Sequence, residues 1–291
     1  MQGDTGIFCQ PMHPPEKARV AIMEIPFDGT VSNRPGARFG PDAIRQATLN
    51  VEDYSPYLKR DISRVPIHDA GSLELPVGDT ARVLETIAEK YRRLTETGLR
   101  VVALGGEHLI SLPVVEAMHE RYGDSLFVVQ LDAHADLRSE YLGVSLSHSA
   151  VMRHITDRIG RDKTAVVGVR SGTADEWEEL RAHPHFFGPL APRHLGEFGA
   201  FARDTLKDRR VYLTIDLDVF DPGIMPGTGT PEPGGIAFPD AMLIFKALAD
   251  AGADIVGADI VELAPHYDHS GISSALAATL LRELILLMGA S

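Results

Sequence analysis

Short apolar runs alternate with longer amphipathic stretches along the chain of 291 residues. The apolar runs are rich in Val, Ile and Leu and lack a polar residue at every second position, a pattern typical of strands covered on both faces. The predicted strands are residues 18–25, 100–104, 125–131, 165–169, 210–215 and 254–260. Apolar residues at helical spacing predict helices over residues 79–97, 112–122, 148–159, 174–182, 239–251 and 272–288.

The alternation of strands and helices predicts the fold class. It favours a mainly parallel sheet with helices on both faces, a single-domain three-layer α/β/α sandwich. The sequence contains no Ser/Gly/Pro-rich linker, charge block or internal repeat, so we expect one domain over residues 1–291, with residues 1–17 as a peripheral N-terminal segment. The Gly- and Pro-rich stretch at 222–235 lies inside the alternation and is interpreted as a functional loop.

Composition narrows the possible partners. The chain has 28 Lys and Arg against 41 Asp and Glu, a formal net charge of −13. Such an acidic balance argues against a nucleic-acid partner, which favours a basic face. It permits a cationic substrate, although solubility is the more general explanation of the net charge.

Cysteine usage and the chain ends bear on location. The single cysteine, Cys9, excludes an internal disulfide and a zinc site built from several thiolates. The first residues lack a basic stretch followed by an apolar core, so no signal peptide is predicted and a cytoplasmic location is expected. Arg282 and Glu283 interrupt the apolar stretch at 272–288, which favours a buried terminal helix over a membrane span.

Three clusters of acidic and histidine residues directly follow predicted strands. They are Gly-Gly-Glu-His at 105–108, Asp-Ala-His-Ala-Asp at 132–136 and Asp-Leu-Asp at 216–218. Parallel sheets carry functional groups at the carboxyl ends of their strands. In an extended segment, residues two apart project to the same side, so members of each cluster can converge on one point.

The charges of these clusters predict a binuclear metal site. Four aspartates in one pocket would repel one another strongly unless cations compensate them. Two divalent ions would balance the four charges, and His108 and His134 would supply one imidazole to each ion. Oxygen ligands outnumber nitrogen and sulfur is absent, which favours Mn²⁺ over Zn²⁺. A hydroxide bridging two such ions would be a nucleophile near neutral pH.

These clusters, taken with further motifs, resemble the ureohydrolase family, which includes arginase and agmatinase. The resemblance covers most of the chain, through RPGARFGP (34–41), GGEH, DAHAD, DLDVFDP, PGTGTPEPGG (226–235) and DIVE (259–262). Within the family, the chain is most similar to bacterial agmatinases, which share GGEH and the Ser-His-Ser at 147–149. The resemblance implies an arginase-like fold and one catalytic domain.

The family pattern implies two Mn²⁺ per subunit and assigns their ligands. One ion would be held by His108, Asp132, Asp136 and Asp216. The other would be held by Asp132, His134, Asp216 and Asp218, so Asp132 and Asp216 would be shared.

The resemblance also implies roles for residues outside the ligand set. His148 matches a family histidine that shuttles protons or contacts substrate, and Glu262 matches the carboxylate that pairs with the substrate guanidinium. A carboxylate can bind two N–H groups of a planar guanidinium at once. Either Asp136 or His148 could protonate the departing amine, and the sequence does not choose between them.

The loop at 137–148 bears on which guanidine is cleaved. Arginases carry an Asn- and Thr-rich loop here for the α-carboxylate and α-amino group, whereas this loop has neither residue and contains Glu140. An acidic loop favours a small cationic guanidine ending in an amine, so we expect agmatine to give putrescine and urea, a step of polyamine biosynthesis. Arg138 could face a carboxylate, so guanidinobutyrate and arginine remain alternatives.

Two hypotheses from other classes remain. Zinc deacetylases use a similar fold with one metal, and the presence of both Asp136 and Asp218 argues against them. A non-catalytic family member would be expected to have lost a ligand, and all six are present. The family often forms trimers or hexamers, and the apolar C-terminal helix would suit such an interface, although packing within one chain explains the helix equally well.

Overall fold

A parallel sheet forms the middle layer of the computed structural model, which describes residues 6–189 and 192–289. The sheet has eight strands in the order β4-β1-β5-β10-β9-β6-β7-β8, and the neighbouring pairs are parallel. A separate two-stranded sheet pairs β2 with β3 in antiparallel fashion. The strands are β1 (Val20–Ile25), β2 (Tyr54–Ser55), β3 (Arg60–Asp61), β4 (Ile67–Ser72), β5 (Arg100–Gly105), β6 (Leu126–Leu131), β7 (Thr164–Val167), β8 (Phe186–Phe187), β9 (Arg210–Asp216) and β10 (Asp254–Val261).

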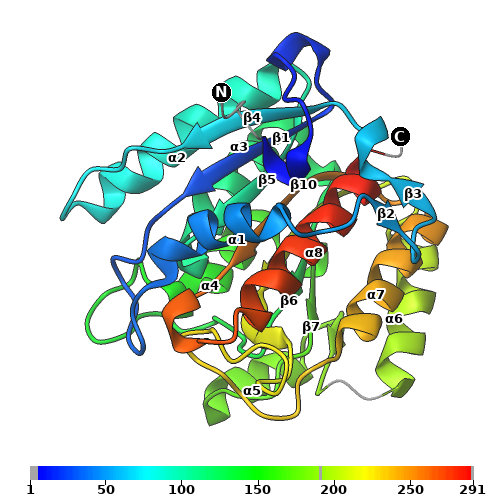
Figure 1. Cartoon of the computed structure of the whole chain (residues 1–291). Coiled ribbons are helices and arrows are strands. Elements are labelled where there is room, and N and C mark those ends of the chain that lie inside the picture. The colour runs from blue at the N-terminus through cyan, green and yellow to red at the C-terminus, as the bar shows by residue number, and fades with distance from the viewer. Residues whose placement is uncertain (1–5, 190–191, 290–291) are drawn as a thin grey trace.

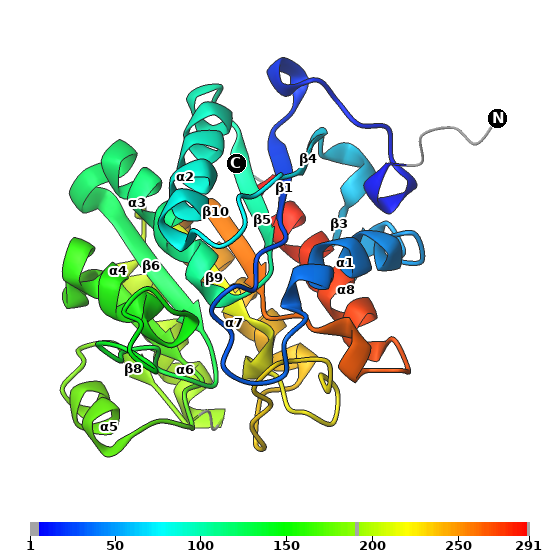
Figure 2. The ribbon, with the colours of Figure 1, turned by 90° about the vertical axis from the view of Figure 1, so that its left-hand side faces the viewer.

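Helices cover both faces of the sheet. In Figure 2, α2, α3 and α4 lie on one side of the strands and α1 and α8 on the other. Figure 1 shows α6 and α7 side by side beyond α8, and the two helices pack together. The helices are α1 (Gly40–Thr48), α2 (Thr80–Glu96), α3 (Ser111–Tyr122), α4 (Val151–Ile159), α5 (Ala174–Arg181), α6 (Pro192–Thr205), α7 (Phe238–Ala251) and α8 (Ile272–Met288).

Two apolar cores separate these layers. Successive residues of one strand point to opposite faces of the sheet, so Ile22 joins the core beneath α1, α7 and α8, while Met23 joins the core beneath α2, α3 and α4. Every residue of β1 is buried. The predicted three-layer α/β/α sandwich with a mainly parallel sheet is therefore confirmed, and the strands are covered on both faces as their composition indicates.

The predicted strands and helices all occur, with ends shifted by at most two residues except where a 3-10 turn, His148–Ala150, precedes α4. The sequence patterns missed the edge strands β4 and β8, the small sheet of β2 and β3, and the helices α1 and α6. Strand β4 reads Ile-His-Asp-Ala-Gly-Ser and is only half-buried, so it lacks an apolar run. Helix α6 contains Gly196 and Gly199, which weaken the helical signal.

The chain ends differ in burial. Residues 1–5 lie outside the described part, whereas Ile7 and Phe8, within the segment expected to be peripheral, are buried in the larger core. Helix α8 is largely buried, and its Arg282 pairs with Glu283 at 2.5 Å. Among the described residues, none of the helices combines the length and apolar character that crossing a membrane requires.

Strand order places four carboxyl ends at the centre of one sheet edge. Strand β10 is the last in sequence but lies between β5 and β9, and β6 follows β9. The register aligns Val261 with Asp216 and Leu131 with Ile215. The segments that follow these four strands therefore meet at the same edge.

Candidate metal centre and active site

The six residues predicted as metal ligands converge at this central edge. His108 starts the turn after β5, the Asp-Ala-His-Ala-Asp segment follows β6, and Asp216 ends β9 with Asp218 in the next turn. Two groups within the described residues have ligand atoms that lie within 4.8 Å of one another. The first contains His108, Asp132 and Asp136, and the second contains Asp132, His134 and Asp218.

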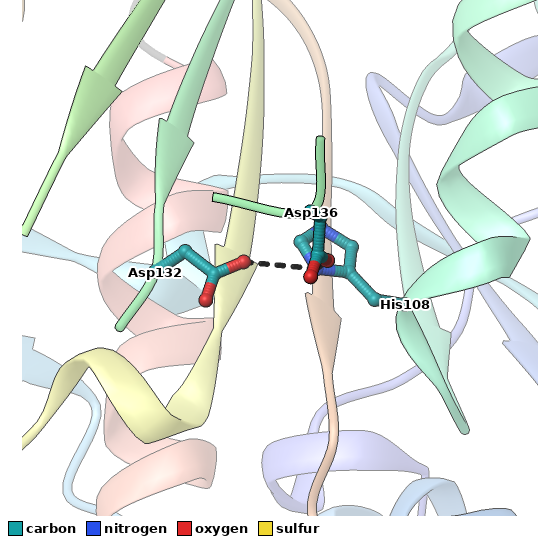
Figure 3. A group of neighbouring side chains, drawn as sticks. All are labelled: His108, Asp132 and Asp136. Carbon is teal, nitrogen blue, oxygen red and sulfur yellow. Dashed lines mark ion pairs between the residues drawn. The ribbon is translucent and has the colours of Figure 1, made fainter. Parts of the chain in front are cut away.

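The first group surrounds the Nδ1 atom of His108. Nδ1 lies 3.1 Å from Oδ2 of Asp132 and 3.1 Å from Oδ2 of Asp136, and Oδ2 of Asp216 is 3.5 Å away. Figure 3 shows the Asp132 and Asp136 carboxylates directed at this imidazole. Two ligands about 2.1 Å from one ion and at right angles lie about 3.0 Å apart. The spacing therefore fits ligands of a common ion.

The second group surrounds His134. Its Nδ1 is 2.9 Å from Oδ2 of Asp218 and 3.8 Å from Oδ1 of Asp132. Asp132 thus offers Oδ2 to the first group and Oδ1 to the second. A carboxylate that serves two groups in this way has the geometry of a residue shared between two ions.

Hydrogen bonds orient the carboxylates. Backbone N–H groups donate to Asp132 from His134 at 2.6 Å and to Asp218 from Ala133 at 3.0 Å. The Gln130 amide donates to Oδ2 of Asp132 at 2.8 Å. Asp136 has a φ of 52°, in the left-handed region that non-glycine residues rarely adopt, and this conformation sets the direction of its side chain.

The hydrogen bonds of His108 test whether the site suits a cation. Its Nε2 lies 2.8 Å from Oγ1 of Thr214, and that hydroxyl donates to Asp259 at 2.7 Å. Thr214 must therefore accept from an Nε2–H, which leaves the lone pair of the neutral ring on Nδ1. Nδ1 is buried without a hydrogen-bond partner among the described residues, although three carboxylates face it. A metal ion satisfies this atom and the carboxylates together.

Charge repulsion supports the same conclusion. Burial, with the charges of Asp136 and Asp218, raises the pKa of Asp132 to about 7. Burial, with the charges of Asp218 and Asp132, also raises the pKa of Asp216 well above its usual value. Burial opposes protonation of His134, but the charge and hydrogen bond of Asp218 outweigh it and raise its pKa to about 11. The carboxylates thus attract positive charge, as a divalent cation site requires.

Glu262 stands beside the ligands. It follows β10 with a φ of 68°, its N–H donates to the Gly106 carbonyl at 2.7 Å, and its Oε1 accepts from the His108 N–H at 2.8 Å. The side chain is buried, and burial together with the charge of Glu107 raises its pKa. A bound cation would favour the ionised form.

His148 lies across the same cavity. Its Nδ1 is 2.9 Å from the Thr30 carbonyl and its Nε2 is 3.1 Å from Oγ of Ser32. Burial lowers the pKa of His148, so the ring is neutral at pH 7.

A cavity of about 270 Å³ lies at this edge of the sheet. Its wall includes Glu262, His148 and ligands from both groups. Glu140, predicted to contact substrate, is exposed and is not among the lining residues, which instead include its neighbours Arg138 and Tyr141.

The cavity wall also contains a buried acid that no sequence motif indicates. Glu176 lines the cavity from the first turn of α5, where it forms a capping box with Thr173. Its Oε2 lies 3.8 Å from Nε of Arg138, whose guanidinium stacks over Tyr141 at 4.8 Å. The Thr-x-x-Glu spacing marks a helix start. This spacing does not indicate that the start of α5 faces the cavity.

The chain is similar to known proteins over most of its length. A model of the arginase family matches residues 18–287. The agmatinase of Bacillus subtilis (strain 168) is 41% identical over 274 residues, which cover 93% of this chain and 92% of that protein. The N(1)-aminopropylagmatine ureohydrolase of Thermococcus kodakarensis is 38% identical over 258 residues, 87% of this chain and 85% of that protein.

Solved structures agree. The agmatine ureohydrolase of Thermoplasma volcanium superposes with a TM-score of 0.81 at 31% identity, covering 95% of this chain and 92% of that one. Proclavaminate amidino hydrolase from Streptomyces clavuligerus gives a TM-score of 0.87 at 29% identity, over 98% and 97% of the two chains. The chain therefore belongs to the arginase family, whose members are binuclear metal-dependent enzymes. Within that family it is an agmatinase-like ureohydrolase.

Proposed function

We propose that this enzyme uses two Mn²⁺ per subunit to hydrolyse agmatine to putrescine and urea. The proposal depends on one observation, the convergence of two ligand groups that share Asp132 on a cavity that Glu262 and His148 also line. When bound, two ions there would lower the pKa of the water between them and stabilise the charge that develops during attack on the guanidinium carbon.

Glu262 is the residue that we propose binds the guanidinium. It is a buried carboxylate in the cavity wall, held by the backbones of Gly106 and His108. A carboxylate fixed in this way can pair with two N–H groups of the planar cation and set the orientation of its plane. The binding free energy of the substrate then helps to orient the reacting carbon.

We propose His148 as the group that holds and returns a proton. The Thr30 carbonyl can only accept a hydrogen bond, so the neutral ring carries its proton on Nδ1 and presents a lone pair on Nε2. Nε2 can take a proton and deliver it to the departing amine. Asp136 is the alternative donor, and its place among the ligands makes it the weaker candidate because a bound cation lowers carboxylate basicity.

Two further lining residues, Glu176 and Arg138, bear on the end of the substrate that does not carry the guanidinium. Buried Glu176 supports a substrate that ends in an amine, and relatives with about 41% identity over 93% of the chain are named agmatinases. Arg138, 3.8 Å from Glu176, favours a second candidate that ends in a carboxylate, namely guanidinobutyrate or arginine.

A urea-release assay tests these alternatives. Metal-stripped protein is loaded with Mn²⁺ or Zn²⁺ and given agmatine, arginine, guanidinobutyrate or acetylated polyamines. We expect urea from agmatine with Mn²⁺ and little from the other guanidines. Urea mainly from guanidinobutyrate or arginine would transfer the proposal to the carboxylate-ended substrate. Acetate release with Zn²⁺ would support a deacetylase, and no product from any guanidine would refute the hydrolase proposal.

Assembly and location remain proposals. We propose a homo-oligomer, a trimer or hexamer, in the cytoplasm, acting on a small cationic guanidine without nucleic-acid or membrane partners. Light scattering after size exclusion measures the assembly directly, and a monomeric mass at micromolar concentration would contradict it.

A further inference from the structure

Glu107 is a buried acid that the proposed reaction does not use. It precedes His108, but its carboxylate binds a different part of the chain, with Oε2 accepting from the Thr30 N–H at 2.8 Å and Oε1 accepting from the Thr30 hydroxyl at 2.5 Å. Its relative exposure is 0%. Burying a carboxylate costs free energy unless hydrogen bonds compensate it, so this arrangement calls for an explanation.

The loop that carries Thr30 is pressed against the end of β5. The Gly106 N–H donates to the Ile25 carbonyl at 2.9 Å, and the Glu107 N–H donates to the Phe27 carbonyl at 2.7 Å. A Cβ atom at Gly106 would lie 1.8 Å from the Phe27 carbonyl oxygen, so only glycine permits this approach. The base of the loop is thus fixed by backbone contacts, and Glu107 fixes the loop further along, at Thr30.

Thr30 in turn holds His148, 118 residues away in sequence. The His148 N–H donates to Oγ1 of Thr30 at 3.1 Å, and the ring Nδ1–H donates to the Thr30 carbonyl at 2.9 Å. The single hydroxyl proton of Thr30 goes to Glu107, which leaves Oγ1 free to accept from His148. Glu107 therefore sets the orientation of the hydroxyl that receives the His148 backbone.

We propose that Glu107 is a positioning residue for the reaction, which acts through Thr30 to hold His148 with the Nε2 lone pair directed to the Ser32 hydroxyl at the cavity wall, where it can exchange protons. The inference rests on the proposed function, in which Nε2 of His148 transfers the proton. Thr30 donates two hydrogen bonds to Glu107 and accepts two from His148, and these four form one connected chain of contacts. A shift of about 1 Å in a reacting group is enough to slow an oriented reaction by orders of magnitude.

Variants of Thr30 and Glu107 test the inference. Thr30→Val keeps the shape and the carbonyl but removes the hydroxyl, Thr30→Ser keeps the hydroxyl, and Glu107→Gln weakens the acceptor. We expect Thr30→Val and Glu107→Gln to lower kcat for agmatine about tenfold with KM nearly unchanged, as loss of a positioned proton carrier should. Thr30→Ser should restore kcat to within about twofold. Thr86→Val, on an exposed turn of α2, is the matched control.

A double-mutant cycle separates positioning from a general structural role. In a His148→Gln background, Thr30→Val should change kcat by less than about twofold, because the group that it positions is already absent. Equal losses in both backgrounds, or no loss in wild-type background, would overturn the inference. Metal content and the thermal transition of each variant show that it is folded and loaded.

A second readout does not depend on turnover. Nitrogen-15 NMR of labelled imidazoles reports which ring nitrogen carries the proton, and the His148 signal is assigned by its loss in His148→Gln. We expect an Nδ1–H tautomer in the wild type and a mixed population in Thr30→Val. A wild type that releases no urea yet shows this tautomer would refute the proposed function alone. An Nε2–H tautomer in an active wild type would refute the positioning inference alone.

Discussion

Asp132 and Glu262 are both buried acids in one cavity, but they meet different partners. Asp132 gives one oxygen to each ligand group, whereas Glu262 is held by the backbone N–H of His108 and the backbone carbonyl of Gly106. A ligand determines whether an ion binds, and a residue that pairs with substrate determines whether the bound ion is used. Mutation should therefore separate the two roles.

Asp132→Asn should lose metal and activity together, because the amide removes the negative charge that both groups share. Glu262→Gln should keep two ions per subunit and lose turnover by about a hundredfold or more, since the neutral amide cannot pair with a guanidinium. Metal analysis by mass spectrometry and urea release measure the two quantities. A Glu262→Gln enzyme with full activity would remove this residue from the site.

His183 predicts how stability depends on pH. Its Nδ1 accepts from the His185 N–H at 3.1 Å, and its Nε2 lies 3.0 Å from Oγ1 of Thr164. Burial and the charge of Arg161 lower its pKa from 6.5 to about 4. As the pH falls, His183 therefore becomes protonated near pH 6.5 in the unfolded chain but only near pH 4 in the folded chain.

The stability that His183 contributes is present above pH 6.5 and is lost as the pH falls toward 4. We expect the loss to be about 3 kcal/mol, with the stability of His183→Gln falling less steeply with acid over this window. Urea denaturation of both proteins at a series of pH values gives the difference. Parallel curves for wild type and variant would contradict the expectation.

The kinds of ligand could be predicted at the residue scale, and their surroundings could not. Spacing of two along a strand end marks Asp132, His134 and Asp136 in the sequence, because the alternation of side chains is local. Glu176 reaches the cavity, and Thr30 reaches His148, from distant segments of the chain, and no local pattern reports such contacts. The exposed position of Glu140 shows the same limit, because charge alone does not say which residue of a loop faces inward.

At the scale of elements, the junction of β5 with the loop after β1 rests on one glycine. Gly106→Ala would place a methyl group 1.8 Å from the Phe27 carbonyl oxygen, so the backbone must move. We expect a loss of about 2 kcal/mol in the free energy of unfolding and a strong loss of activity, since the loop holds His148. Gly196→Ala in α6, with nothing within 4 Å, should instead stabilise the protein by about 0.5 kcal/mol.

Denaturant unfolding and urea release of both variants measure these effects. Equal free energies of unfolding for Gly106→Ala and wild type would contradict the prediction, because the loop would then have moved without loss of stability.

Central elements were predicted better than those at the edges, for a physical reason. Strands β1, β5, β6, β9 and β10 are covered on both faces, so most of their residues are apolar. Edge strand β4 is half-exposed and carries His68 and Asp69, which pair with groups outside the strand. Its strand conformation comes from pairing with β1 rather than from its own composition.

At the scale of the whole molecule, the carboxylates predicted to bind metal repel one another when no metal is bound. Four aspartates at the tips of β6 and β9 lie in one cavity region, and burial with neighbouring charge raises the pKa of Asp132 to about 7. Below that pH, metal must displace a proton from Asp132, so metal affinity should rise as the pH increases through 7.

Removing metal should lower the melting temperature, because ions that bind only the folded chain stabilise it by about 2.7 kcal/mol at a hundred times their dissociation constant. We expect one cooperative transition, as for a single domain, several degrees lower after chelation and restored by Mn²⁺. Calorimetry at pH 6 and 8 tests both statements. An Asp132→Asn protein should not respond to Mn²⁺, and a wild type with the same melting temperature in both states would contradict the prediction.

The position of β10 has a consequence for how the protein is made. Residues 254–261 form the strand that joins β5 to β9, so during synthesis from the N-terminus these two strands lack their common partner until residue 261 has been added. The nascent chain therefore exposes two unpaired strand edges of the kind that chaperones cover. His108 follows β5 and Asp216 ends β9, so pairing of β10 with both strands brings these two candidate ligands to the same sheet edge.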